Sequence, residues 1–226
     1  LLNIFAQILI MHLELSEQEQ IRRDALRQLR ELGIDPFPAE GFEITHSARE
    51  VTDIFDRDEN ALDEVSLAGR IMSRRIMGAA SFTELQDSSG RIQLYFKRDE
   101  ICPGDDKTLY NTVFKRLLDI GDIIGVKGRM FRTQMGEITL EVKEFKLLSK
   151  SLRPLPVVKE KDGKVYDAFT DPDQRYRQRY LDMIVNPGVR EVFRQRTLMV
   201  NSMRQFLNEK GYLEVETPIL QPLYGG

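Results

Sequence analysis

The sequence has 226 residues, of which 41% are hydrophobic and 31% are charged, and its formal net charge is −3. This composition excludes a disordered chain and predicts one or two globular domains. Because the balance is mildly acidic, nucleic acid could be held only by a local patch. The only cysteine, Cys102, excludes an intrachain disulfide and a cysteine-rich zinc site and fits a reducing cytosol. Two histidines, His12 and His46, argue against a histidine-based catalytic or metal centre.

The two ends of the sequence are unusual. Residues 1–10 are apolar but too short to cross a bilayer, and they have neither the basic region nor the cleavage site of a signal peptide. We expect them to be a non-native leader before a start at Met11, the alternative being a hydrophobic anchor. The sequence stops at Gly225 and Gly226 directly after a strand-like segment, which is typical of a truncated chain.

Residues 11–63 are expected to form a helical extension. Ser16 and Glu19 have the spacing of a capping box, and Gly33 supplies a stop, so a helix is predicted over 16–32. Apolar residues at helical spacing form a stripe along one side of this helix, and the rest of its surface is rich in arginine. That surface is either a solvated helix face or a contact to a nucleic-acid backbone. The apolar residues are Ile21, Ala25, Leu29 and Leu32, and the basic ones are Arg22, Arg23, Arg27 and Arg30.

Residues 64–150 carry the clearest fold signal. Three segments with strand-like alternation are followed by an apolar helical pattern that ends at Gly121, and then by two more strands. This order matches the five-stranded Greek-key barrel known as the OB-fold. The predicted strands are 65–76, 80–86, 91–97, 123–132 and a fifth that contains Ile138, Leu140 and Val142.

Side chains on the second and third strands are candidates for nucleic-acid contact. Strand 91–97 has one apolar face, and its other face carries Gln93, whose amide can both donate to and accept from a base edge. Phe82 could stack on an unpaired base or pack in the core, and the pattern leaves both open. Glu137, between the last two strands, could accept from amino or ring N–H groups. OB-fold barrels bind single strands on this face, so the three residues together indicate base recognition.

Residues 151–187 are expected to form a linker, and residues 188–226 the beginning of a second domain. The arginines of Arg175–Tyr180 could bridge phosphates or bind carboxylates that hold two domains together. Residues 188–210 have the periodicity of a long helix, and 213–217 then alternate as in a strand. The large apolar face of this element is typical of a subunit interface.

Three segments resemble the class II aminoacyl-tRNA synthetases, and in particular the lysyl-tRNA synthetase family. Residues 210–218 resemble motif 1, a long helix joined to a strand that ends in an interface proline. Residues 65–98 are similar to the family's anticodon-binding barrel, and 175–182 to the segment that joins the barrel to the catalytic domain. The barrel and motif 1 alone are also consistent with the aspartyl- and asparaginyl-tRNA synthetases. A free-standing RNA-binding module is the non-catalytic alternative. Arg74–Gly78 and Arg153–Pro156 favour the lysyl family.

The resemblance implies a mixed α and β fold, with an N-terminal helix, an OB-fold barrel and the start of a class II α+β catalytic domain. It implies a cytoplasmic homodimer that uses ATP and Mg²⁺ to attach lysine to tRNA(Lys) through lysyl-adenylate, with no membrane or DNA partner. The catalytic arginines and the Mg²⁺ ligands would lie beyond Gly226. We therefore expect no catalytic or metal-binding residue in this sequence, and no adenylate formation by this chain alone.

The resemblance also assigns roles to individual residues. Phe82 would stack on the central anticodon base, a uridine, and Gln93 would hydrogen-bond to its edge. Glu137 and Arg75 would complete the anticodon pocket. Gly225 matches a glycine-rich loop whose backbone contacts lysine in this family.

Overall fold

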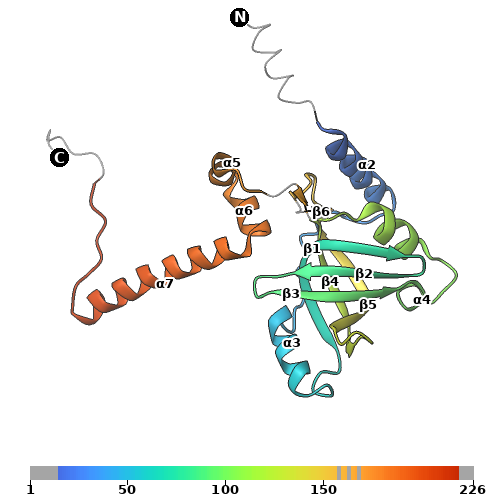
Figure 1. The fold of residues 1–226 in the computed structure, drawn as a ribbon, viewed down its shortest axis with the longest axis horizontal. Coiled ribbons are helices and arrows are strands. Elements are labelled where there is room, and N and C mark those ends of the chain that lie inside the picture. The colour runs from blue at the N-terminus through green and yellow to red at the C-terminus, as the bar shows by residue number, and fades with distance from the viewer. Residues whose placement is uncertain (1–14, 157–158, 162–163, 167–168, 219–226) are drawn as a thin grey trace, which may run out of the picture. The chain divides into compact units, whose positions relative to one another are not determined.

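The computed structural model describes residues 15–156, 159–161, 164–166 and 169–218. The chain divides into two compact units, residues 1–155 and residues 156–226 (Figure 1). In its described residues, the first unit contains two helices followed by a barrel, with two further helices between the third and fourth strands. The second contains a short hairpin and three helices.

Five strands close into a barrel in the order β1-β2-β3-β5-β4, which confirms the predicted OB-fold. All neighbouring strands are antiparallel except β3 and β5, which are parallel. Strands two, three and four have the predicted bounds, and the first is one residue longer. The strands are β1 (Val65–Met77), β2 (Ala80–Gln86), β3 (Arg91–Lys97), β4 (Ile123–Arg132) and β5 (Ile138–Ser149).

The barrel interior is filled by the alternate residues that the sequence pattern placed there. On β3, Ile92, Leu94 and Phe96 are buried, while Gln93 and the other odd-numbered residues face outward. The predicted apolar helix forms as η1 (Leu109–Leu117), after the short helix α4 (Arg98–Ile101). Phe114 of η1 stacks on Phe96 with ring centroids 4.1 Å apart, so η1 closes one end of the core.

From residue 15 onward, two helices precede the barrel, α2 (Glu17–Glu31) and α3 (Ala48–Arg57). The predicted capping box of α2 is confirmed, because Ser16 accepts from the backbone N–H of Glu19 and Glu19 accepts in return from the backbone N–H of Ser16. Helix α3 was not predicted. Ser47 and Glu50 form the same reciprocal cap on it, and this spacing was the signal in the sequence.

The buried face of α2 differs from the prediction. Ala25 and Leu29 are buried as expected, but Ile21 is exposed and Arg22 takes its place in the interface, with 6% of its surface accessible. The Arg22 guanidinium donates to the carbonyl oxygens of Ile120 and Ser151 at 2.9 and 3.0 Å. Both interpretations of Arg22, a solvated cation or a phosphate contact, were therefore wrong, because its charge is used to join α2 to the barrel.

The second unit has a two-stranded hairpin, formed by β6 (Lys159–Lys161) and β7 (Lys164–Tyr166). Three helices follow it, and the long one lies within a residue of the predicted 188–210. Its apolar face is exposed, and no residue of this helix is buried. The helices are α5 (Pro172–Arg177), α6 (Arg179–Val185) and α7 (Pro187–Glu209).

The arginine-rich segment binds carboxylates within this unit. Arg175 and Arg179 both pair with Asp182, at 3.0 and 2.5 Å, and Asp182 is fully buried. These contacts agree with a structural role for the segment. The strand expected over 213–217 is not formed, although 213–218 are described. Alternation alone does not make a strand, since its backbone groups must also find a neighbouring strand among the residues present.

Candidate nucleic-acid interface

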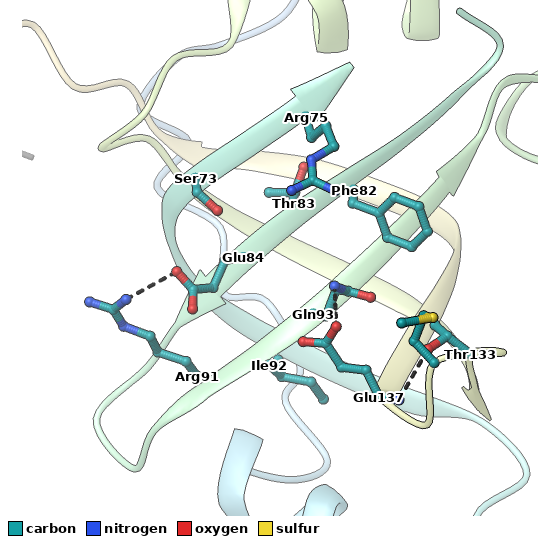
Figure 2. A pocket seen from close by; sticks show the side chains of 11 residues that line it. Ser73, Arg75, Phe82, Thr83, Glu84, Arg91, Ile92, Gln93, Thr133 and Glu137 are labelled. Carbon is teal, nitrogen blue, oxygen red and sulfur yellow. Dashed lines mark hydrogen bonds and ion pairs between the residues drawn. The ribbon is translucent and has the colours of Figure 1, made fainter. Parts of the chain in front are cut away.

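A pocket of about 450 Å³ lies on the outer face of the barrel, over β1, β2 and β3 and beside the loop between β4 and β5 (Figure 2). This pocket is lined by all four residues that the resemblance assigned to the anticodon site, namely Arg75, Phe82, Gln93 and Glu137. The full lining consists of Ser73, Arg75, Phe82, Thr83, Glu84, Arg91, Ile92, Gln93, Thr133, Met135 and Glu137.

Strand register explains why these residues meet. Arg75 on β1 is the cross-strand partner of Phe82 on β2, and Phe82 is in turn the partner of Tyr95 on β3. In the next row of side chains on the same face, two residues before Tyr95, Gln93 on β3 lies opposite Thr139 on β5. Directly opposed residues share a face of a sheet, so two neighbouring rows of side chains build the pocket floor.

The aromatic part of the site is a stack of rings on the outer face. Phe82 is half-buried, and its ring stacks on Tyr95 with centroids 4.8 Å apart and an angle of 28° between the planes. Tyr95 also contacts Phe131 on β4 at 5.8 Å. Because Phe82 lines the pocket and is supported from one side by Tyr95, its ring is placed for stacking rather than for core packing.

The amide of Gln93 is held between two oxygen-bearing side chains. Its Nε2 donates to Oε2 of Glu137 at 2.7 Å, and its Oε1 accepts from the hydroxyl of Thr139 at 2.9 Å. Thr139 is fully buried, whereas Gln93 is half-buried and lines the pocket. Each amide group still has one hydrogen-bonding position left, so Gln93 can offer both a donor and an acceptor to a ligand.

A tight turn positions Glu137. Thr133 donates its backbone N–H to the carbonyl of Glu137 at 2.9 Å, and its hydroxyl accepts from the Glu137 N–H at 3.0 Å. Gly136 has a φ of +87°, which favours glycine at this point of the turn. Arg132 donates to the carbonyl of Gly136 at 3.2 Å and pairs with Asp56 of α3, so α3 supports the turn from outside.

The charges of the pocket are partly neutralised. Arg91 pairs with Glu84 at 3.0 Å. The side chain of Arg75 is exposed, and its guanidinium has no hydrogen bond or ion pair to any residue that the structure describes. Its guanidinium is therefore available to an anionic ligand such as a phosphate.

Sequence reasoning missed three residues that shape this site, Thr133, Thr139 and Tyr95. Tyr95 lies on the same outward face of its strand as Gln93, and the alternation of that strand was the signal for it. The contact between Thr139 and Gln93 depends on the parallel pairing of β3 with β5, which local alternation does not reveal. The lysine-binding residue implied by the resemblance, Gly225, lies outside the described residues.

Two further observations concern the part of the chain that the structure describes. No group of three or more His, Cys, Asp or Glu side chains in it could hold a metal ion. None of its helices is long and apolar enough to cross a membrane.

Two families of known sequences match this chain. Residues 65–148 match the OB-fold nucleic acid binding domain of the tRNA anti-codon family, and residues 171–226 match the tRNA synthetases of class II (D, K and N). Together the two matches cover more than half of the sequence, in the order expected from the resemblance. Residues 171–226 are therefore similar to the class II tRNA synthetases of the D, K and N group, and residues 65–148 to their OB-fold nucleic acid binding domain.

Individual relatives narrow this class and confirm the resemblance to lysyl-tRNA synthetases. A lysine--tRNA ligase from Porphyromonas gingivalis is 62% identical over 215 residues, which are 95% of this chain and 37% of the relative. Lysine--tRNA ligases from Christiangramia forsetii and Azobacteroides pseudotrichonymphae are 58% and 57% identical over 94% of this chain, and it covers 37% and 42% of their lengths. The chain thus spans well under half the length of these curated relatives.

Proposed function

We propose that the whole protein is a lysine--tRNA ligase, and that this chain contributes the part that recognises the anticodon of tRNA(Lys). The observation that carries the proposal is the meeting of Arg75, Phe82, Gln93 and Glu137 in one pocket on the outer face of the barrel. A stacking ring, an amide with free hydrogen-bonding positions and an unpaired cation are what an unstacked nucleotide requires.

Each of these groups has a role in the proposal. Phe82 stacks on the central base of the anticodon, a uridine, with Tyr95 as its support. Gln93 hydrogen-bonds to the edge of that base. Arg75 binds the phosphate backbone beside it, and Glu137 completes the pocket wall.

The remaining features of the proposed enzyme concern the whole protein. It uses ATP and Mg²⁺ to form lysyl-adenylate and then transfers lysine to tRNA, as a homodimer in the cytoplasm. Gly225 contributes its backbone to the lysine site.

Binding of isolated anticodon stem-loops to the 226-residue chain tests the recognition role. We expect a stem-loop with the UUU anticodon to bind more tightly than the stem-loops of aspartate and asparagine tRNAs, which share its central uridine. It should also bind more tightly than a UCU stem-loop, which differs only at the centre. Equal affinity for the lysine, aspartate and asparagine stem-loops would contradict the assignment to lysine tRNA. Equal affinity for the UUU and UCU stem-loops would contradict the proposal that this pocket recognises the central uridine.

A further inference from the structure

The two groups that hold the carboxamide of Gln93 differ in chemistry. Nε2 of Gln93 lies 2.7 Å from a carboxylate oxygen of Glu137, and Oε1 lies 2.9 Å from the hydroxyl of Thr139 (Figure 2 shows the first contact). An ionised carboxylate accepts hydrogen bonds but cannot donate them, so the NH₂ group must face Glu137. A carboxamide has two orientations related by a half-turn, and this contact selects one of them.

The selected orientation matters because the two pyrimidines present opposite patterns. On its Watson–Crick edge, uracil presents the acceptor O4 at position 4 and the donor N3–H at position 3. Cytosine offers a donor and then an acceptor at the same positions, the N4 amino group and N3. A carboxamide presents one donor beside one acceptor, so one orientation matches uracil and the other matches cytosine. A freely turning Gln93 would accept both bases.

Glu137 and Thr139 make unequal contributions to this choice. A hydroxyl can donate to Oε1 or accept from Nε2, so Thr139 supports either orientation. Thr139 is fully buried on β5 and keeps the amide in place. Only the carboxylate of Glu137 distinguishes the two ends of the amide. The backbone of Glu137 is held by two hydrogen bonds to Thr133, and the side chain reaches Gln93 from this turn.

We propose that Glu137 is a positioning residue that excludes cytosine from the pocket by imposing one orientation on the Gln93 carboxamide, with Thr139 as the second anchor. This inference rests on the proposed function, whose central uridine identifies the imposed orientation as the one that matches uracil. It deepens that function, since it assigns to Glu137 an action through Gln93 instead of a contact with the base. It predicts a gain of binding, because a pocket released from this constraint admits a base that it previously rejected.

Glu137→Gln in the full 226-residue chain is the decisive variant. A glutamine amide has the size of the carboxylate but can donate as well as accept, so it satisfies both orientations of Gln93. We expect the UCU stem-loop to bind more tightly to the variant than to the unchanged protein, and the preference for UUU over UCU to fall about tenfold, as expected for loss of one charge-assisted hydrogen bond. If UUU binding weakens while UCU binding stays the same, Glu137 contacts the base directly and the inference is wrong.

Glu84→Gln is the matched control. Glu84 lines the same pocket and is the cross-strand neighbour of Gln93, but its carboxylate pairs with Arg91 at 3.0 Å and has no hydrogen bond to the Gln93 carboxamide among the contacts of the described residues. We expect this variant to keep the preference for UUU. A Glu84→Gln variant with the same loss of preference would show that net charge causes it. If the unchanged protein itself does not prefer UUU over UCU, the proposed function fails as well.

Discussion

The ammonium group of Lys150 lies 2.9 Å from a carboxylate oxygen of Asp122, and both side chains are fully inaccessible to solvent. Lys150 also pairs with Asp119 at 2.5 Å. Asp122 accepts further hydrogen bonds from the backbone N–H groups of Asp119 and Ser151, each at 2.7 Å. Burial raises the pKa of the Asp122 carboxyl, and Lys150 opposes that rise. This network ties the end of β5 to the turn before β4.

Lys150→Met is expected to destabilise the chain strongly. Removing the ammonium group leaves Asp122 as an unpaired buried carboxylate, and breaking a buried pair in this way costs about 3–5 kcal/mol. Urea unfolding followed by circular dichroism measures the loss. Lys146→Met is the control, because Lys146 pairs with the exposed Glu40, and an exposed pair contributes at most about 1 kcal/mol. A similar loss in both variants would contradict the role given to the buried pair.

Asp87 links the β2–β3 turn to the N-terminus of α3, and its contacts predict a pH-dependent stability. Its carboxylate accepts from the backbone N–H groups of Ala48, Ser89 and Gly90 at 2.7 to 2.8 Å. Burial would raise the pKa of Asp87, but these hydrogen bonds and one from the Ser89 hydroxyl outweigh burial and lower it. The folded protein therefore releases this proton more readily than the unfolded chain does.

The sign of the effect follows from that difference. The contribution of Asp87 is fully present above the unfolded pKa, about 3.9, and is lost as the pH falls through the lower pKa of the folded state. Asp87→Asn should reduce the free energy of unfolding at pH 7 by about 1 kcal/mol, the value of a helix cap. The difference from the unchanged protein should shrink as the pH falls below about 4. A difference that stays constant between pH 7 and pH 3 would contradict this account.

Phe82→Ala is expected to weaken binding of the UUU and UCU stem-loops alike. Stacking on an aromatic ring is worth about 1–3 kcal/mol per base and tolerates any base, so affinity falls while base preference stays. Phe37→Ala is the control, since Phe37 is an exposed aromatic residue that does not line the pocket. Fluorescence anisotropy of labelled stem-loops measures both effects. Unchanged affinity in a folded Phe82 variant would show that its ring has no contact with the base.

The fold and the site were predictable from sequence to different degrees. The alternation on β3 has a strict period of two, so the burial of Ile92 and the outward position of Gln93 follow from the pattern. Phe82 and Gln93 lie on adjacent antiparallel strands joined by a short turn, which brings them together by local pairing alone. The resemblance then indicated which of these outward residues matter.

Other features depend on contacts between distant parts of the chain. Arg22 is buried because it reaches carbonyl groups 98 and 129 residues further along the chain. Thr139 meets Gln93 only because β3 and β5 are parallel neighbours. Residues 213–217 have the alternation of a strand but pair with no strand among the described residues. No local pattern contains this information, since a pattern specifies a face but not its partner.

Arg75→Gln is expected to change the salt dependence of RNA binding. The Arg75 guanidinium has no hydrogen bond or ion pair to another described residue, so we expect its charge to bind a phosphate in the proposed complex. Each phosphate contact to a single strand contributes about 0.7 to the slope of log affinity against log salt concentration. The variant should therefore bind UUU and UCU stem-loops more weakly by a similar factor, with a slope smaller by about 0.7 to 1. Arg194→Gln is the control, because Arg194 lies on α7 and pairs with Glu191. A loss of base preference without a change of slope would show that Arg75 contacts the base.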